Sequence, residues 1–389
     1  MKSKFGIIFV VLFMTGRILA QGGILPNIRQ TYISTSFGFQ MWRIGGYVNP
    51  ITQASFPVSI MFPMGRRFNL TITHTPAMSH WYEETKINGF SDTWFQGTYV
   101  FWDEKAMINL GLGAPTGKTR LTNNEFLLSN WLGLNIFHFR VPVYGQGLCG
   151  KVGFAMAYPI LENLVIGVGG QYLHKRPFHP ISYRTSYYLN SLDSTVVSTW
   201  EGEYKPGDEV TANIGLDFGI NENMKIMFDG IYTYYWRDLR SGQEVYGSGQ
   251  KISMNWGFLY RLGKNYLWSR FTYRHKGKNE LATYYGISSI EKEAQNSNGS
   301  QMELDIILKV MDIEGSGIFI YGDTRFHDRN EVDETGKALL FGGGFGANVK
   351  ITSGTMLDFR FKYHVGSLTT TEDRNIEGVS TFIGIRFEI

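Results

Sequence analysis

The sequence contains few of the features that define several common protein classes. It has a single cysteine, Cys149, among 389 residues, which excludes a fold held by disulfides within the chain. Proline occurs 11 times and glycine follows no period of three, so a collagen-like chain is excluded. A charged fraction of 18% beside 15% aromatic residues excludes disorder, and a net charge of +3 gives no indication of a nucleic-acid partner.

Long apolar runs are absent beyond the first twenty residues. No later stretch reaches the roughly 18 apolar residues of a membrane-spanning helix, which excludes a helical membrane protein. Lys2 and Lys4, an apolar run over 5–14 and the small Ala20 before Gln21 predict a signal peptide at residues 1–20. We therefore expect residues 21–389 to form a single exported domain.

The sequence is rich in glycine and in aromatic residues, and its apolar residues alternate with polar ones. In the clearest stretch, the apolar series Leu357, Phe359, Phe361, Tyr363 and Val365 alternates with Asp358, Arg360, Lys362 and His364. A period of two is typical of a β-strand with one apolar face. Similar runs of about nine to thirteen residues recur along the chain, against roughly 5–6 for strands of soluble sheets.

This pattern predicts an all-β fold, a transmembrane antiparallel up-and-down β-barrel of about 14–16 strands. Short turns alternate with long polar connections at about 114–146, 176–206 and 277–300, which we expect at the periplasmic and extracellular ends respectively. A secreted β-sandwich is the alternative. We count sixteen candidate strands, of which the first spans residues 36–48 and the last spans residues 377–389. Pro57 and Pro63 interrupt the first ones, so fourteen strands with residues 21–62 partly in the lumen remain possible.

Charged residues on the polar faces are expected to point into the lumen. The candidates are Lys251, Arg261, Arg270, Arg274, Glu303, Asp305, Lys309, Asp323, Arg325, Asp358, Arg360, Lys362 and Arg386, with Asp229 and Glu388 beside them. They would line a pore or bind a ligand, or they would form a neutralising ladder across strands that seals a narrow barrel. Because the signs are mixed, strong anion or cation selectivity is not expected.

The segment 123–138 is the one stretch with a helix-like apolar pattern. Its candidate residues for contact with a hydrophobic ligand are Phe126, Leu127, Trp131, Leu132 and Phe137. Such a helix would lie on the outer rim as a landing site, or it would fold into the barrel mouth as a plug. The sequence leaves both placements open.

Motifs for catalysis or for metal binding are not evident. The eight histidines are scattered without metal-ligand spacing, and no nucleophile elbow is present. The glycine runs at 167–170 and 342–346 lie in predicted strands without a following helix, so a phosphate loop is not indicated. We expect no enzyme activity, no catalytic residues, no metal and no cofactor.

One mid-chain segment carries a family resemblance. Residues 151–159 (KVGFAMAYP), a tight turn, residues 164–172 and Lys175-Arg176 resemble the mid-barrel hairpin of the outer-membrane transporters of hydrophobic compounds, the long-chain fatty-acid and toluene channels. That family also has apolar extracellular helices, which 123–138 resembles. Its long N-terminal plug carries Asn-Pro-Ala, whereas this chain has Asn49-Pro50-Ile51, so no binding residue is transferred.

The resemblance implies an outer-membrane channel or transporter that passes or binds small, mainly hydrophobic solutes by passive transport. A general porin and a structural anchor or adhesin that acts through extracellular loops are the alternatives. The expected partners are the outer-membrane bilayer of a Gram-negative cell, small hydrophobic solutes and the barrel-assembly machinery, with no nucleic acid.

Overall fold

The computed structural model describes residues 31–82, 85–180, 182–189, 194–201, 203–282, 290–332 and 335–389, and the predicted signal peptide at 1–20 lies outside them. The wall strands are β1 (Tyr32–Ile44), β2 (Ile51–Ser55), β3 (Val58–Pro63), β4 (Phe68–His74), β5 (Pro76–Tyr82), β6 (Thr85–Phe90), β7 (Thr93–Phe101), β8 (Ala106–Ala114), β9 (Cys149–Leu161), β10 (Leu164–Lys175), β14 (Glu209–Gly219), β15 (Met224–Tyr235), β18 (Lys251–Leu262), β19 (Asn265–Lys276), β22 (Gln301–Ile313), β23 (Ser316–His327), β24 (Ala338–Thr352), β25 (Thr355–Thr369) and β26 (Asp373–Glu388).

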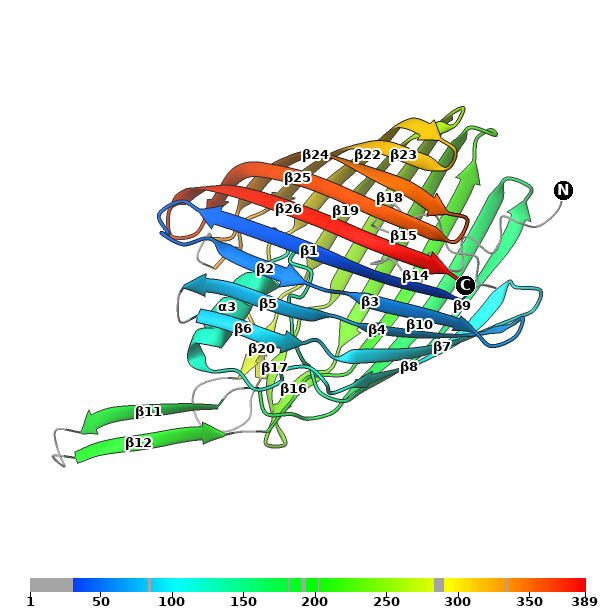
Figure 1. Cartoon of the computed structure of the whole chain (residues 1–389). Coiled ribbons are helices and arrows are strands. Elements are labelled where there is room, and N and C mark those ends of the chain that lie inside the picture. The colour runs from blue at the N-terminus through cyan, green and yellow to red at the C-terminus, as the bar shows by residue number, and fades with distance from the viewer. Residues whose placement is uncertain are drawn as a thin grey trace.

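These strands close into an antiparallel barrel (Figure 1). The last strand, β26, pairs with β1 along the whole length of β1, from Tyr32 opposite Glu388 to Ile44 opposite Ile376. The wall has 16 strands when β2 and β3, β4 and β5, and β6 and β7 are each counted as one. The predicted fold is therefore confirmed at its upper strand count.

The alternative with fourteen strands is wrong, because residues 32–63 belong to the wall rather than to the lumen. Pro57 separates β2 from β3, yet the register against β1 continues unchanged, with Ser55 opposite Gly38 and Val58 opposite Thr35. A proline that lies between two short strands removes one hydrogen bond from the ladder and leaves the alternation of faces intact.

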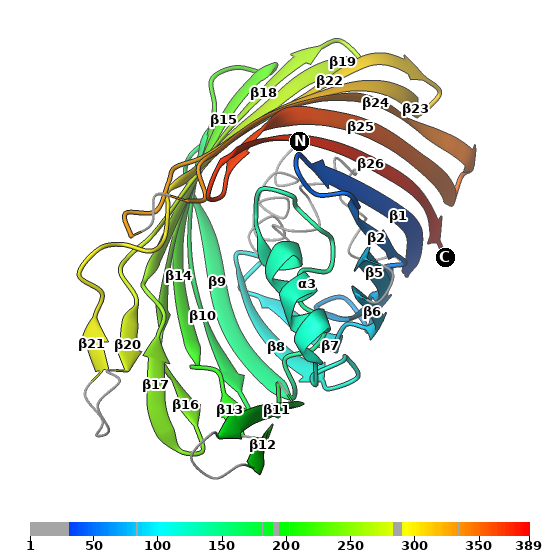
Figure 2. The ribbon, with the colours of Figure 1, turned by 90° about the vertical axis from the view of Figure 1, so that its left-hand side faces the viewer.

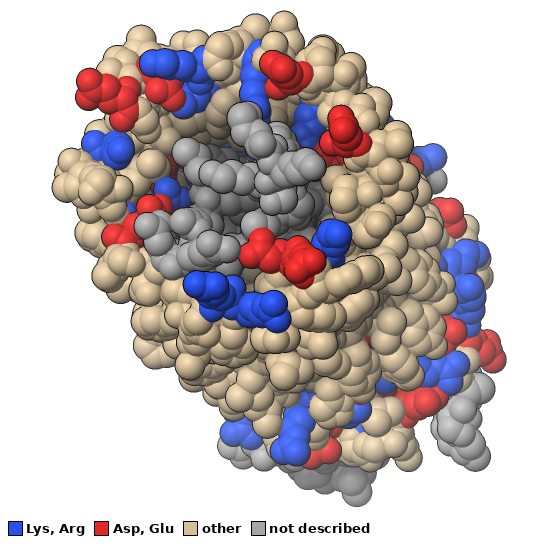
Figure 3. Space-filling view, turned by 90° about the vertical axis from the view of Figure 1, so that its right-hand side faces the viewer, with Lys and Arg blue, Asp and Glu red and all other residues tan. Residues whose placement is uncertain are grey.

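The two ends of the barrel differ. At one end the strands are joined by short turns, such as Glu162–Asn163 between β9 and β10, and Lys, Arg, Asp and Glu side chains are spread around the rim (Figure 3). The other end carries further strands: β11 (Ser182–Leu189), β12 (Ser194–Glu201), β13 (Tyr204–Lys205), β16 (Arg237–Arg240), β17 (Gln243–Gly247), β20 (Glu280–Ala282) and β21 (Ile290–Lys292). In an outer-membrane barrel the end with short turns faces the periplasm.

The outer face of the wall is apolar and aromatic. Phe228, Trp256 and Phe271 lie opposite one another on β15, β18 and β19, and consecutive ring centroids are 5.5 and 5.4 Å apart. Trp102 and Tyr158 stack at the periplasmic rim. An outward apolar band with aromatic rims is typical of barrels that face lipid. No helix in the described part of the chain is long and apolar enough to cross a membrane.

Candidate functional site in the barrel lumen

The segment between β8 and β9, residues 115–148, leaves the wall and returns next to the point where it left. We call this segment the plug. Asp92, between β6 and β7, accepts one hydrogen bond from the N–H of Gly117 (3.0 Å) and another from the N–H of Gln146 (2.6 Å). A Cβ on Gly145 would lie 2.8 Å from the carbonyl carbon of Gly117, so both ends of the plug are in contact.

The plug contains helix α3 (Asn123–Gly133), which lies inside the barrel (Figure 2). A capping box begins the helix: the N–H of Thr122 donates to Glu125 Oε2 (2.9 Å), and the N–H of Glu125 donates to Thr122 Oγ1 (3.4 Å). The helix ends at Leu134, whose N–H donates to the carbonyl of Trp131. Of the two placements considered for 123–138, the structure therefore shows the plug.

The plug is held on one side of the wall by an apolar cluster. Trp42 of β1 and Phe137 of the plug are almost fully buried, and their ring centroids are 5.1 Å apart. The other wall members of the cluster are Ile44, Ile51, Ala77, Ile87, Ala338, Leu340, Leu368 and Ile376. Burying side chains of this size stabilises the contact by roughly 1.5–3 kcal/mol each.

Two glutamines of the wall bind the plug backbone. Gln53 donates from Nε2 to the carbonyl of Val141 and accepts from its N–H, both at 2.9 Å. Gln40 likewise donates to the carbonyl of His138 and accepts from the N–H of Arg140, again at 2.9 Å. An extended segment with no strand partner would leave its backbone N–H and carbonyl groups without hydrogen bonds. The glutamine side chains provide these hydrogen bonds in place of a neighbouring strand.

Charged residues of the adjoining wall strands also reach the plug. Arg325 of β23 donates to the carbonyl of Ile136 (2.6 Å), and His138 Nε2 lies 2.8 Å from Glu303 Oε1. Arg274 of β19 donates to the same oxygen of Glu303 at 2.7 Å. The buried Glu303 carboxylate therefore links the plug to two wall strands, β19 and β22.

Asp323 is the centre of a second buried group. Lys362 donates to its Oδ1 at 2.8 Å, while Arg325 Nη2 and His364 Nε2 each lie 3.2 Å from Oδ2. Asp323 and His364 are only 5% and 1% exposed. Removing a carboxylate from water costs free energy, and here the contacts with the cations Arg325 and Lys362 offset that cost. If the carboxylate or a cation is removed, the remaining buried charge is left uncompensated and the fold is destabilised.

The remaining charged candidates lie along the same inner face. Arg270 donates to Asp305 at 2.7 Å, Lys309 bonds Asp312, and Arg386 Nε is 3.5 Å from Glu388. Arg360 lies over the ring of Phe382, and Asp358 precedes it on the same face of β25. Lys251 is at the extracellular end of β18, and Arg261 is exposed at its periplasmic end. These pairings support the ladder interpretation, and a role in solute binding stays a prediction.

The structure separates the hydrophobic candidates into two groups. Leu132 and Phe137 are 1% and 0% exposed and Trp131 packs against them, so these side chains hold the plug in place. Phe126 and Leu127 remain 40% and 54% exposed and are available to a ligand. Their contact with a solute is still a prediction.

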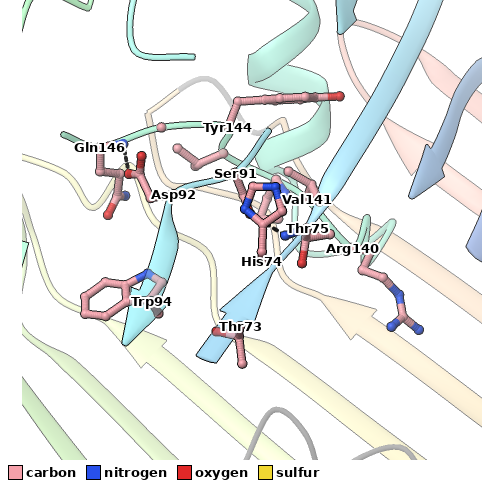
Figure 4. A pocket seen from close by; sticks show the side chains of 13 residues that line it. Thr73, His74, Thr75, Ser91, Asp92, Trp94, Arg140, Val141, Tyr144 and Gln146 are labelled. Carbon is pink, nitrogen blue, oxygen red and sulfur yellow. Dashed lines mark hydrogen bonds between the residues drawn. The ribbon is translucent and has the colours of Figure 1, made fainter. Parts of the chain in front are cut away.

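A cavity of about 340 Å³ lies between the plug and the wall (Figure 4). The wall contributes Thr73, His74, Thr75, Ser91, Asp92 and Trp94, and the plug contributes residues 140–146. This volume is at the lower end of the range for small-molecule sites. The lining combines the rings of Trp94, Tyr144 and His74 with the hydroxyl groups of Thr73, Thr75 and Ser91 and with the charged Asp92 and Arg140. A single-ring organic molecule fits a cavity of this size.

Sequence reasoning did not find Asp92, Gln40, Gln53 or Arg140. Asp92, Gln40 and Gln53 bind the plug, which is distant from them in sequence, and Arg140 lies in the plug itself, so the alternation pattern marks none of them. One sequence signal was available for Gln53. It carries a large amide side chain on the same strand face as the apolar Ile51 and the small Ser55.

The closed wall, its apolar outer face and its charged inner face define an outer-membrane β-barrel that carries a plug formed by one of its own loops. No protein-family model and no curated protein matches the chain. Similar solved structures include the CymD monoaromatic hydrocarbon channel (11% identity, TM-score 0.45, covering 93% of this chain and 89% of that one). Pseudomonas putida OprB (8%, 0.48, 97% and 97%) and a TodX monoaromatic hydrocarbon channel mutant (8%, 0.43, 93% and 91%) are also similar. At these identities no solute is assigned to this chain.

Proposed function

We propose that this chain is a plugged channel that passes small, mainly hydrophobic solutes across the outer membrane by passive transport. The observation that carries the proposal is the cavity of about 340 Å³ that the plug and the wall line together. A passive channel needs a route through the wall's interior, and a site of this size beside a loop-formed plug provides the narrow part of such a route. The proposal includes export by a signal peptide at 1–20, insertion by the barrel-assembly machinery, and no catalytic step.

A general porin is the less favoured function. Porins of 16–18 strands leave an aqueous channel, whereas here the plug is anchored to the wall by buried aromatic rings and by Gln40 and Gln53. The structural anchor is supported only by the extracellular strands β11, β12, β13, β16, β17, β20 and β21, which extend beyond the wall. Loss of partner binding without loss of uptake after deletion of 176–206 or 277–300 would favour the anchor.

The test is removal of the plug. Because Gly117 and Gly145 are in contact and both ends bind Asp92, residues 119–144 can be replaced by two glycines without moving β8 or β9. In planar bilayers we expect the full chain to conduct weakly and the deletion variant to conduct at least about tenfold more. Deletion of the hairpin 182–201 is the matched control, since it lies outside the wall, and it should leave the conductance unchanged.

Passage of hydrophobic solutes is tested separately in cells that express the chain. The probe is 1-N-phenylnaphthylamine, whose fluorescence rises when it passes the outer leaflet of the outer membrane. Expression of the full chain should accelerate this rise, and the hairpin deletion should behave as the full chain does. A high conductance of the full chain without any acceleration would support the porin instead.

A further inference from the structure

His364 of β25 is buried in the inner wall behind an aromatic contact that holds the plug. Its side chain is 1% exposed, and its ring lies on Trp42, with the ring centroids 5.2 Å apart. Trp42 in turn packs against Phe137 of the plug. A Cβ on Gly342 would lie 2.4 Å from the His364 ring, and a Cβ on Gly378 would lie 2.4 Å from the Trp42 ring. The wall is therefore shaped around the imidazole, which is one ring away from the plug.

The imidazole of His364 lies between a cation and a carboxylate. Its Nε2 is 3.2 Å from Nη2 of Arg325 and 3.2 Å from Oδ1 of Asp323. Arginine only donates hydrogen bonds, so it is an unprotonated Nε2 that accepts from it. Nδ1, on the other side of the ring, is buried and has no hydrogen-bond partner among the described residues. A protonated imidazole donates from both nitrogens, so one N–H would face the guanidinium and the other would have no acceptor. This arrangement suits the neutral imidazole.

The charged side chains around His364 carry more positive than negative charge. Arg325 and Lys362 both bind Asp323, which in the described part of the chain is the only carboxylate in contact with the ring. The neighbouring positions on β24 and β26 are Gly342 and Gly378, and neither can titrate. The charged and titratable groups of this network are Arg325, Asp323 and His327 of β23, Lys362 of β25, Glu303 of β22, Arg274 of β19 and His138 of the plug, with Arg270 and Asp305 nearer the periplasm. A proton on His364 would add a third cation to one shared carboxylate.

The arginine that touches His364 also holds the plug. Arg325 Nη1 donates to the carbonyl of Ile136 at 2.6 Å, and its guanidinium carbon is 5.9 Å from the centroid of Trp42. Two residues further along the plug, His138 has a φ of +51°, in the left-handed region that few residues other than glycine adopt. Backbone strain of this kind persists only where surrounding contacts maintain it. Loss of the Arg325 contact therefore favours release of this segment from the wall.

We propose that His364 is a proton-controlled latch of the plug. In the closed barrel the imidazole is neutral. When the pH falls it takes up a proton, the added charge repels Arg325, the Ile136 carbonyl loses its donor and the plug leaves the wall. The released form binds the proton more tightly, because water then surrounds the ring, so acid shifts the equilibrium towards it. The inference rests on the proposed function, since it regulates the plug of that channel.

Acid should open the channel over a defined pH range. An imidazole in water has a pKa of about 6.5. Well above that pH neither form takes up the proton, and the plug stays in place. Below it the open form gains the proton and the closed form does not, so the ratio of open to closed barrels rises by up to about tenfold for each pH unit.

The test is the conductance of the full chain in planar bilayers at about pH 7.5 and at about pH 5, on either side of the ordinary imidazole pKa. The conductance should rise at least about tenfold on acidification. His364→Gln has no charge at either pH and should keep the low conductance. Lys362→Gln removes one cation beside the ring, so the closed form tolerates the proton and the rise should be smaller. His179→Gln is the matched control, because His179 is exposed in the connection that follows β10, and it should respond as the parent does.

Hydrogen exchange at the Val141 amide, corrected for the intrinsic rate, reports on the plug itself. Over the same pH range it should accelerate at least about tenfold in the parent and stay constant in His364→Gln. Heat-modifiable gel mobility checks that every variant is a folded barrel, and His364→Asn takes the place of His364→Gln if that variant does not fold.

A parent whose conductance and exchange do not rise in acid would overturn the latch, and so would a rise that persists in His364→Gln. Conduction after plug removal, without any effect of pH on the full chain, refutes this inference alone. Acid-dependent exchange at Val141 that requires His364, without conduction after plug removal, refutes the proposed function alone.

Discussion

The inner wall of the barrel has two sectors that differ in what satisfies their side chains. In the plug-facing sector, on β1, β2, β5, β6 and the extracellular ends of β24–β26, the inner side chains are apolar and buried against the plug. In the adjoining charged sector, on β19, β22, β23 and β25, they are charged and bind one another. The first sector depends on a loop from elsewhere in the chain, whereas the second is largely completed by its neighbouring strands.

The largest effect should come from the apolar sector. Phe137→Ala removes a fully buried ring from the plug, which should cost about 3–5 kcal/mol of local stability. The plug should then become sensitive to limited proteolysis within 119–144 while the barrel stays folded. Phe271→Ala, on the lipid-facing side of β19, is the control. Equal protease resistance of the Phe137 variant and the parent would show that the apolar cluster does not hold the plug.

Substitutions at the buried positions of the charged sector should destabilise the protein nearly as strongly. Asp323→Asn leaves Arg325 and Lys362 without their carboxylate, which should lower the free energy of unfolding by about 3 kcal/mol. Asp305→Asn, in a more exposed pair with Arg270, should cost about 1 kcal/mol or less. Urea unfolding in lipid vesicles measures both variants. Equal losses would mean that burial does not set the strength of this ladder.

A smaller effect is expected where the plug backbone meets a wall amide. Gln53→Ala leaves the N–H and the carbonyl of Val141 without partners, at a cost of about 1–3 kcal/mol. Hydrogen exchange at the Val141 amide should accelerate about tenfold or more. Gln250→Ala removes an exposed amide that accepts a hydrogen bond from the Tyr232 hydroxyl, and it serves as the control. Unchanged exchange at Val141 would contradict a backbone role for Gln53.

The smallest effect concerns the extracellular rim and its pH dependence. Burial raises the pKa of Asp208, but hydrogen bonds from Tyr172, the Lys175 N–H and His174 outweigh it and lower the pKa to about 2. A depressed pKa means that the contribution of this carboxylate to stability is present above about pH 4 and is lost as the pH falls through 2.

Exchange of the Lys175 amide, corrected for the intrinsic rate, should therefore stay constant from pH 6 to pH 4 and rise only near pH 2. Asp208→Asn, which cannot titrate, should show no such rise. An increase that is already complete at pH 4 would exclude the depressed pKa.

The fold could be predicted because a period of two is a local signal. From Leu357 to Val365, the polarity of each residue indicates which face of the strand it occupies, without information from the rest of the chain. The plug could be predicted only in part, because 123–138 shows its own amphipathicity but not the surface that receives it. The sequence indicated one part of that surface. Residues 338–341 (Ala, Leu, Leu, Phe) are apolar on both faces of the strand, whereas a strand between lipid and water needs only one apolar face.

Contacts between distant segments could not be predicted. Asp92 and Gln53 bind backbone groups more than twenty residues away, and a backbone N–H has no sequence signature. The transporters that the chain resembles carry a plug before the first strand, whereas Asn49 and Pro50 of this chain lie in the turn between β1 and β2. The plug arises between β8 and β9, in the long connection whose segment 123–138 the sequence left open to two placements, on the outer rim or in the barrel mouth.

The contact between Gly117 and Gly145 has a consequence for the order of folding. Because the plug starts and ends at one place, β8 and β9 can pair and the wall can close while residues 119–144 are still unfolded. Insertion of the plug can then follow as a separate event, in which a closed loop of chain enters the finished barrel from its extracellular end. A cell can in this way assemble the wall first and limit its permeability afterwards.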